Sequence, residues 1–475
     1  MQQAYLRLLL WHHIYSLISK ALYGNYEGTT LTSIKDLLVT KSPTALLIYG
    51  YVFFLIIAFS LLSLPIAQNS PIEWLDTLFI ATSAVSTTGL ITTQPGVDYS
   101  FFGQLVILLI IQIGGIGYMT FGSFILVALK AKMSKDSLKT SLEMSKREFA
   151  FPKDFKPSTF VKKVVLFTLI VECIGAILLA IIFTQNGEAA PIWSAIFHSV
   201  SAFCTAGFSL MTTSFQSYQG HLAVNFIISA LSLLGAIGFI VMVDVWDVVK
   251  NPRSTPQFST TIILKITFTL LVGGTLFVGF TDDSFNHLPT FERWMTVFFQ
   301  VMTASTTVGF NTFNVANMHI ASVFVMFFLM LFGASPSGTG GGLKSTTLAA
   351  LTAIVRSTLK RRKLVSFDGK RLPLHKLQLA ASSFILAFAI SFIAVTILLI
   401  TEEAPLSWIL FEVLSAIGTV GLTMGLTIEL SDIGKLVIML MMFMGRVGIL
   451  TFGVFLSLRE ENEDEDNQKE EELVL

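Results

Sequence analysis

Charged residues are scarce in this sequence: Asp, Glu, Lys and Arg make up only 13% of its 475 residues. Soluble domains contain about 25% charged residues, and hydrophobic residues here reach 53%. This composition excludes an ordinary soluble domain and is typical of a polytopic membrane protein. Because the 31 basic residues balance the 31 acidic ones, the net charge gives no reason to expect a nucleic-acid partner.

Cysteine is almost absent, and the residue patterns of several chemistries are missing. Cys173 and Cys204 have no CxxC or Cys/His spacing, which excludes a disulfide framework and gives no sign of a metal site. The stretch GGGLKST lacks the spacing of a nucleotide-binding GxxxxGK[ST], and no His/Asp/Glu cluster lies within an apolar stretch. We therefore expect no catalytic residue and no cofactor in this chain, and a membrane enzyme is the weakest hypothesis.

Long apolar runs are abundant, and eight of them reach the ~20 residues that a bilayer requires. The sixth is interrupted, and the eight lie at 44–66, 102–129, 161–184, 221–249, 259–281, 318–355, 377–400 and 433–457. Each pair of runs encloses a segment too short and too polar to span, at 67–101, 185–220, 282–317 and 401–432. The pattern predicts an all-α membrane protein of eight spans, built as four membrane–pore loop–membrane repeats.

Basic residues are missing from one side of this predicted topology. Three of the four polar segments contain no Lys or Arg and the fourth contains only Arg293, whereas 130–163 holds ten basic residues and 356–376 holds eight. Basic loops stay in the cytoplasm, so we expect a protein of the cell membrane with both termini inside. The predicted segments are a cytoplasmic N-terminal segment at 1–43, repeats at 44–130, 161–249, 259–355 and 377–458, cytoplasmic loops at 131–160, 250–258 and 356–376, and an acidic cytoplasmic tail at 459–475.

The four polar segments share one motif, F-x-x-x-[ST]-A-x-x-T-x-G-[LF]. Its copies are FIATSAVSTTGL from Phe79, FHSVSAFCTAGF from Phe197, FQVMTASTTVGF from Phe299 and FEVLSAIGTVGL from Phe411. One copy alone would suggest a small-residue face for helix packing. Four copies about a hundred residues apart, each between two apolar runs, indicate an internal repeat instead.

The motif suits a short descending helix followed by an extended ascent. Proline precedes each helix, where it favours a helix start, and the helix C-terminus would direct partial negative charge toward a cation. Glycine permits the positive φ values needed to turn carbonyl groups toward a common axis. Four copies could then replace the water shell of a cation, as potassium filters do. The predicted ion-binding residues are Ser86, Thr87, Thr88, Gly89, Cys204, Thr205, Ala206, Gly207, Thr306, Thr307, Val308, Gly309, Gly418, Thr419, Val420 and Gly421.

Residues 40–458 resemble the Trk/Ktr/HKT superfamily of cation transporters, and within it the KtrB-type bacterial potassium-uptake subunits. The resemblance depends on the four motifs and on GGIGY at 114–118, GASPSGTGGGLKSTT at 333–347 and GRVG at 445–448. It implies potassium uptake through a pseudo-fourfold pore in one chain, a homodimer, and a cytosolic ring of RCK subunits that alone bind nucleotide. Four filter glycines imply potassium selectivity in this family, and the dependence on sodium stays open. No copy reads TVGYG, which predicts fewer ion sites than in tetrameric potassium channels.

The apolar run after the third motif is broken by glycine. It begins near Met318 and reaches Gly333 after about sixteen residues, which is ~24 Å of helix and short of a ~30 Å bilayer core. We therefore predict a gating loop at mid-membrane depth; the alternative is a helix that ends early and a cytosolic loop. Arg446 lies at a similar distance after its motif, either as an electrostatic barrier or as a structural partner of loop carbonyls. The predicted gate comprises Gly333, Ser335, Ser337, Gly338, Gly340, Gly341, Gly342, Lys344 and Arg446.

An alternating-access cation symporter is the main alternative to a pore. Such transporters show inverted repeats and helices broken in matched pairs. Here the four repeats share one orientation, and the sequence indicates only one clearly broken helix, after Gly333. Both features favour the pore.

Overall fold

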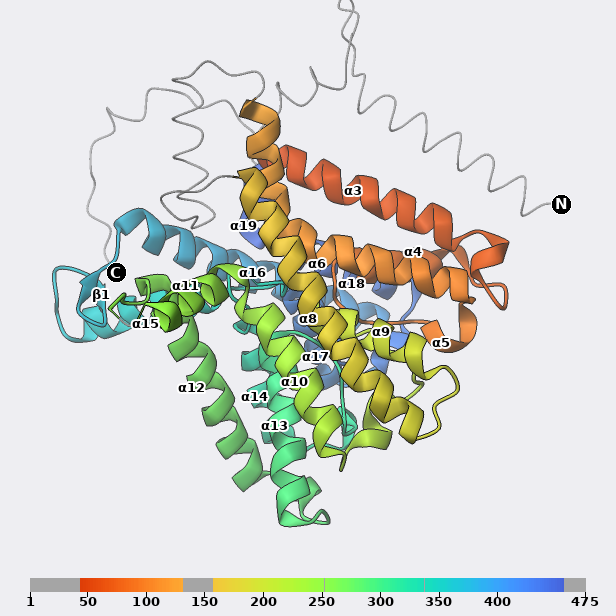
Figure 1. Cartoon of the computed structure of the whole chain (residues 1–475). Helices are drawn as coiled ribbons and strands as arrows, with labels where there is room; N and C mark the ends of the chain where they lie inside the picture. The colour runs from red at the N-terminus through yellow and green to blue at the C-terminus, as the bar shows by residue number, and fades with distance from the viewer. Residues whose placement is uncertain (1–42, 131–156, 252, 337, 457–475) are drawn as a thin grey trace, which may run out of the picture. The chain divides into compact units, whose positions relative to one another are not determined.

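The computed structural model describes residues 43–130, 157–251, 253–336 and 338–456, which Figure 1 colours along the chain. Nearly all of the expected N-terminal segment, nearly all of the basic loop at 131–160 and the whole acidic tail lie outside these residues.

The described chain is mostly helical, and its helices recur in four similar groups, one for each predicted repeat. The first helices of the groups are α3 (Pro43–Leu62), α8 (Pro157–Gln185), α12 (Phe258–Thr281) and α16 (Leu374–Thr401). The short motif helices are α4 (Trp74–Val85), α9 (Pro191–Phe203), α13 (Thr290–Thr306) and α17 (Leu406–Gly418). The second helices are α6 (Phe101–Lys130), α10 (Leu222–Ile237) with α11 (Phe239–Lys250), α14 (Ile320–Leu331) with α15 (Ser345–Leu359), and α18 (Asp432–Val447) with α19 (Ile449–Leu456).

Short elements connect these helices. They are α5 (Pro95–Asp98), the 3-10 turns η1 (Pro65–Ala67), η2 (Gln216–Tyr218), η3 (Asp283–Phe285), η4 (Val315–Asn317) and η5 (Leu426–Glu429), and the hairpin of β1 (Ser366–Phe367) and β2 (Lys370–Arg371). The hairpin lies within the predicted basic loop at 356–376, where Asp368 forms an ion pair of 2.7 Å with Lys265 of α12.

Proline sets the start of three motif helices. Pro191 is the first residue of α9, and Pro289 and Pro405 are the N-caps of α13 and α17. Proline suits these positions because its missing N–H would have no partner in the first turn.

Three described helices are long and apolar enough to cross a membrane: Val161–Gln185 within α8, α12 and α16. A fourth results if α10 and α11, bent by 98° at their junction, count as one span. Their outer faces carry large apolar side chains, with Ile177, Phe268 and Phe388 between 62% and 68% exposed. This apolar exterior fits a membrane-helical protein, while the number of eight spans stays a prediction.

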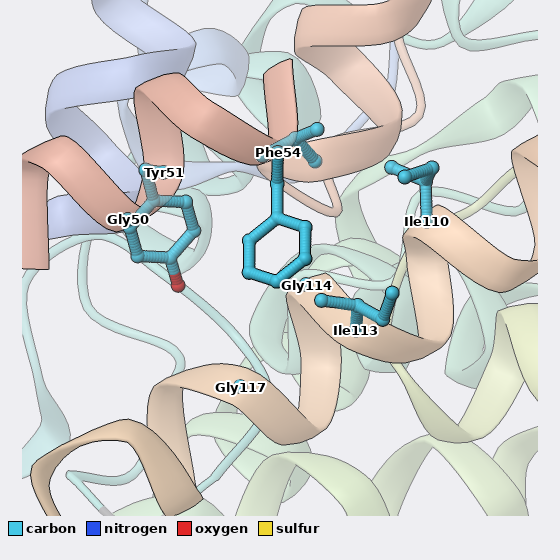
Figure 2. A pocket seen from close by; sticks show the side chains of 8 residues that line it. Gly50, Tyr51, Phe54, Ile110, Ile113, Gly114 and Gly117 are labelled. Carbon is cyan, nitrogen blue, oxygen red and sulfur yellow. The ribbon is translucent and has the colours of Figure 1, made fainter. Parts of the chain in front are cut away.

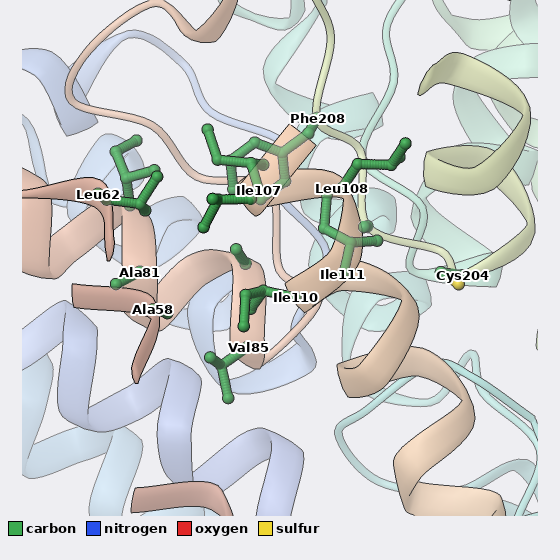
Figure 3. Close-up of a cluster of buried hydrophobic side chains, with 14 of the residues drawn as sticks. Ala58, Leu62, Ala81, Val85, Ile107, Leu108, Ile110, Ile111, Cys204 and Phe208 are labelled. Atoms are coloured by element: carbon green, nitrogen blue, oxygen red, sulfur yellow. The ribbon is translucent and has the colours of Figure 1, made fainter. Parts of the chain in front are cut away.

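The motif helices lie in the interior. The phenylalanine that opens each motif is at most 1% exposed, at Phe79, Phe197, Phe299 and Phe411. One apolar cluster joins the first two repeats, since Leu62, Val85 and Ile107 of repeat 1 pack with Cys204 and Phe208 of repeat 2 (Figure 3). The polar motifs are thereby held inside an apolar shell.

Three second helices are broken, so the expectation of a single break is wrong. Besides the gap between α14 and α15, α10 gives way to α11 at Gly238 and α18 to α19 at Gly448. These glycines have φ values of 87° and 99°, which residues with a side chain rarely adopt. A single glycine inside a continuous apolar run does not change its composition or period, which is why the sequence pattern gave no sign of these breaks.

Candidate functional site

Each motif helix ends in a turn with two left-handed residues. The motif threonines Thr87, Thr205, Thr307 and Thr419 have φ values of 51°, 50°, 57° and 50°. Two residues later Gly89, Gly207, Gly309 and Gly421 have φ values of 89°, 67°, 85° and 91°. Positive φ at the glycines was expected, but at threonine it was not, because β-branched residues rarely adopt it. Four copies of such a strained turn point to a functional constraint.

The same hydrogen bond closes this turn in all four repeats. The N–H of the residue before the glycine donates to the carbonyl five residues earlier, in Thr88–Ser83 (2.9 Å), Ala206–Ser201 (2.8 Å), Val308–Thr303 (3.1 Å) and Val420–Ser415 (2.8 Å). In two repeats the motif hydroxyl also accepts from the glycine N–H, at 3.0 Å for Ser83 and 3.1 Å for Ser415. The Ser/Thr of the motif therefore fixes the turn, a role that the sequence analysis did not assign.

The four turns meet in a closed ring. A Cβ on Gly89 would collide with the carbonyl oxygen of Ala206 in the next repeat. The same collision recurs between Gly207 and Val308, between Gly309 and Val420, and between Gly421 and Thr88. The order of contacts runs from repeat 1 to 2, 3, 4 and back to 1. Each position thus requires glycine for two reasons: the positive φ value and the close approach of the neighbouring carbonyl.

The structure brings all sixteen predicted ion-binding residues to this ring. Ser86, Cys204, Thr306 and Gly418 lie at the ends of the motif helices, directly before the turns. The remaining twelve form the turns themselves. Among these turns the ring hydroxyls of Thr87 and Thr307 have no hydrogen-bond partner although they are buried, which leaves them available to a ligand.

A second set of four glycines packs the second helices against the ring. A Cβ on Gly114, Gly235, Gly333 or Gly445 would collide with the carbonyl of Val85, Phe203, Ser305 or Ile417, respectively. Each of these carbonyls belongs to the fourth residue before the ring glycine of the same repeat. Only glycine allows this backbone contact, which sets the register of each second helix against its motif helix.

The glycine-rich loop between α14 and α15 contacts the turns of two repeats. The hydroxyl of Thr339 lies 3.0 Å from that of Thr205 and donates to the carbonyl of Phe203 at 3.1 Å. On the other side the N–H of Gly341 donates to the hydroxyl of Thr419 at 2.9 Å. A Cβ on Gly340 would collide with the hydroxyl of Thr307 in the third repeat. The loop thus touches the ring threonines of repeats 2, 3 and 4.

The broken second helices supply partners for the loop backbone. The N–H groups of Ser335 and Thr339 donate to the carbonyls of Ala236 and Gly235, and that of Gly342 donates to Gly445. These three bonds measure 3.2, 3.0 and 3.1 Å. Irregular backbone among apolar helices requires such partners.

The predicted gate residues lie together in this region. Gly333, Ser335, Gly338 and Gly340 to Gly342 are in the loop, and Lys344 ends it with Nζ 2.7 Å from the carbonyl of Gly340. Helix α15 begins at Ser345, so the last three residues of the segment predicted at 333–347 are helical. Ser337 lies outside the described residues.

Arg446 joins three parts of the structure while only 2% exposed. Its guanidinium donates to the carbonyls of Thr339 in the loop and Gly114 in α6, and to that of Gly115 at 3.4 Å. A buried arginine is stabilised by such carbonyl contacts. Arg446 thus bonds a loop carbonyl, as the structural alternative expects, and both the structural role and the role in gating stay predictions.

A small cavity of about 30 Å³ lies between α3 and α6, beside Gly114. Phe54 and Ile113 face into it, with Tyr51 at its edge (Figure 2). Its lining is apolar, so it offers no cation site. The described residues also contain no group of three or more His, Cys, Asp or Glu side chains that could hold a metal ion.

Comparisons with known proteins agree with this arrangement. The profile of a family described as "TrkH: Cation transport protein" matches residues 44–465. The Ktr system potassium uptake protein B of Bacillus subtilis is 36% identical over 424 residues, covering 87% of this chain and 93% of that protein. The potassium/sodium uptake protein NtpJ of Enterococcus hirae is 34% identical over 451 residues, covering 91% and 97%.

A solved structure shares the fold. The potassium transporter TrkH from Vibrio parahaemolyticus has a TM-score of 0.68 to this chain at 18% identity, covering 92% of this chain and 88% of the other. Together with the sequence matches, this similarity confirms the resemblance inferred from the motifs.

Proposed function

Because this chain belongs to the TrkH family of cation transport proteins, we propose that it takes up potassium ions through the ring of four glycine turns. The observation that carries the proposal is the closed order of contacts, in which each ring glycine abuts a carbonyl of the next repeat. A closed ring of backbone turns has no other evident use in a chain of this family.

In this proposal the ring is the selectivity filter. The sixteen predicted residues at the ring supply carbonyl and hydroxyl oxygens that replace the water shell of potassium. The four motif helices end at the ring, so their C-terminal partial charges favour a cation there. Positive φ at both threonine and glycine gives the turn the shape that a row of inward carbonyls needs.

The loop from Gly333 to Lys344 is the proposed gate. It contacts three of the ring threonines, and ions that leave the ring would have to pass it. Arg446 and Lys344 add positive charge in this layer, which raises the free energy of a passing cation. Opening therefore requires the hydrogen bond between Arg446 and the loop carbonyl of Thr339 to rearrange.

The membrane potential supplies the driving force. At about −150 mV it is worth roughly 3.5 kcal/mol per charge, which sustains a few-hundred-fold accumulation without ATP. The basic loops predict that both termini lie on the cytoplasmic side of the cell membrane. One relative is named a potassium/sodium uptake protein, so sodium is a candidate second ion.

Partners are proposed from the family resemblance. They are a second copy of this chain and a cytosolic ring of RCK subunits that binds the regulatory nucleotide. The basic segments 130–163 and 356–376 offer the docking face. Crosslinking from Lys370 in the β1–β2 hairpin should capture the ring subunit, and a map of contacts wholly away from both segments would remove this assignment.

An alternating-access symporter remains the second candidate, because three second helices are broken rather than one. The breaks recur in repeats of one orientation, which differs from the inverted pairs of such transporters. The ratio of sodium to potassium ions transported separates the two mechanisms. A symporter moves the two ions in a fixed ratio, whereas a pore does not.

Substitution of one ring glycine tests the filter. Gly89→Ser places a Cβ against the carbonyl of Ala206 and should lower the preference for potassium over sodium while the protein still assembles. Gly273→Ser is the matched control, because a Cβ there meets nothing within 4 Å. Rubidium and sodium uptake into liposomes measures both variants. An unchanged preference in folded Gly89→Ser would refute the filter.

A further inference from the structure

Two positions of the repeated motif change together along the chain. One is the residue after the motif phenylalanine, and the other is the second residue after the ring glycine. The two are eleven residues apart in every repeat. The four pairs are Ile80 with Ile91, His198 with Ser209, Gln300 with Asn311, and Glu412 with Thr423.

In repeat 4 this pair is a direct hydrogen bond. Glu412 lies on α17 with no exposed surface, and its carboxylate accepts from the hydroxyl of Thr423. The second carboxylate oxygen accepts from the hydroxyl of Thr427 at 2.9 Å. Because Thr423 follows Gly421 by two residues, the carboxylate ties the outer end of the turn to the motif helix. Hydrogen bonds to a charged group are the stronger ones.

Repeat 2 makes the equivalent contact with different residues. His198 is fully buried on α9, and its Nε2 lies 2.9 Å from the hydroxyl of Ser209. The other ring nitrogen, Nδ1, lies 2.7 Å from the carbonyl oxygen of Ser194, which fixes the orientation of the imidazole. The imidazole therefore bridges the first turns of α9 and the segment beyond Gly207.

In repeat 3 the two side chains meet at one carbonyl. Gln300, fully buried on α13, donates through Nε2 to the carbonyl of Phe313 at 2.6 Å. Asn311 donates to the same carbonyl at 3.3 Å. The segment beyond Gly309 is thus bound to its motif helix indirectly.

Repeat 1 replaces the polar pair with an apolar one. Ile80 is fully buried, and Ile91 packs against the same apolar cluster. In repeats 2 and 4 a polar side chain at one position alone would lose its hydrogen-bond partner at the other. The two positions are thus polar together in three repeats and apolar together in the fourth.

We propose that His198, Gln300 and Glu412 are positioning residues that hold the outer ends of three filter turns, with repeat 1 as the quarter held by packing alone. The inference rests on the proposed filter function and deepens it. By fixing the segment beyond each glycine, these side chains keep the ring from closing around the smaller sodium ion. They therefore contribute to selectivity without touching the ion.

One substitution at equivalent positions of two repeats tests the inference. Glu412→Leu removes the carboxylate of repeat 4, whereas Ile80→Leu puts the same residue at the matching position of repeat 1. Glu412→Leu should lower discrimination between potassium and sodium by about tenfold, the size expected for one hydrogen bond to a charged group. Ile80→Leu should keep wild-type discrimination, and Glu412→Gln, which retains an acceptor oxygen, should recover most of the loss.

Discrimination is measured with the full-length proteins in liposomes, by rubidium uptake against increasing sodium. Wild-type discrimination in folded Glu412→Leu would overturn the inference, and so would an equal loss in Ile80→Leu. If Glu412→Leu fails to assemble, Thr423→Val removes the partner hydroxyl alone and should also lower discrimination between potassium and sodium. Thr423→Ser restores the hydroxyl and should restore the discrimination. Wild-type discrimination in folded Thr423→Val would overturn the inference. Gly89→Ser in the same assay separates the two proposals: a loss there without one in Glu412→Leu or Thr423→Val rejects only the positioning residues, whereas no loss in any variant rejects the filter.

Discussion

The ring of four glycine turns differs in symmetry from the layer that adjoins it, which contains the loop between α14 and α15 and the side chain of Arg446. In the ring every repeat has the same pair of left-handed residues and the same closing hydrogen bond. In the adjoining layer one repeat alone supplies a thirteen-residue connection between helices, from Phe332 to Lys344, and another alone supplies Arg446. Coordination of one ion from all sides requires equal turns. Opening and closing requires only one element with two arrangements.

The two regions also differ in how their backbone is satisfied. Each ring turn is closed by a bond within its own repeat, such as Thr88 to Ser83. The loop depends on other repeats, through Ala236, Gly235 and Gly445, and on the side chain of Arg446. A segment held by partners on several elements responds when any of them moves, which suits a gate.

The same substitution at each of the four ring glycines, one at a time, should have the largest effect on discrimination between potassium and sodium. Alanine at Gly89, Gly207, Gly309 or Gly421 combines a strained φ with a collision against the next carbonyl. Each change should lower discrimination between potassium and sodium on the order of a hundredfold. Competitive rubidium uptake measures it, with Gly273→Ala as control. A loss confined to one or two repeats would break the claim that the four turns act as equals.

Neutralising Arg446 should have the next largest effect. Arg446→Gln removes the positive charge beside the ring and should raise potassium flux roughly tenfold. Arg446→Lys keeps the charge and loses the two-pronged contact with Thr339 and Gly114, so flux should rise less than in Arg446→Gln while thermal stability falls. Flux in liposomes and Tm are measured together. Equal flux in the two variants would show that the positive charge of Arg446 does not oppose the passage of potassium.

Removal of one loop hydroxyl should have a smaller effect. Thr339→Val abolishes the contacts with Thr205 and Phe203 and should raise flux about fivefold, as expected for one lost hydrogen bond. Thr339→Ser retains the hydroxyl and should behave as wild type. Equal flux in the two variants would show that these contacts do not hold the gate closed.

The sequence predicted the parts of the site that depend on glycine and on repetition. The four motifs identified the ring residues, and the stretches GGIGY, GASPSGTGGGLKSTT and GRVG contain Gly114, Gly333 and Gly445 of the layer beside it. Both sets are glycines that a Cβ would disrupt, and an invariant small residue at a fixed spacing is visible without a structure.

The rest of the site could not be predicted because it depends on contacts between distant segments. The bonds of Arg446 join residues more than 100 and more than 300 positions apart. The break at Gly448 depends on one φ value within an apolar run. Glu412 would be taken for an ordinary acid of an outer segment, because only the folded chain shows it buried beside Thr423.

Potassium flux through a protein with a shortened loop tests the central claim most directly. The claim is that the symmetric ring selects and the asymmetric loop gates. Deletion of Gly338–Gly342 should raise rubidium uptake into liposomes at a set voltage and leave the discrimination against sodium unchanged, with deletion of Asp368–Gly369 in the hairpin as control. Wild-type flux in the folded variant, or a rise in flux accompanied by lost discrimination, would contradict the separation of the two roles.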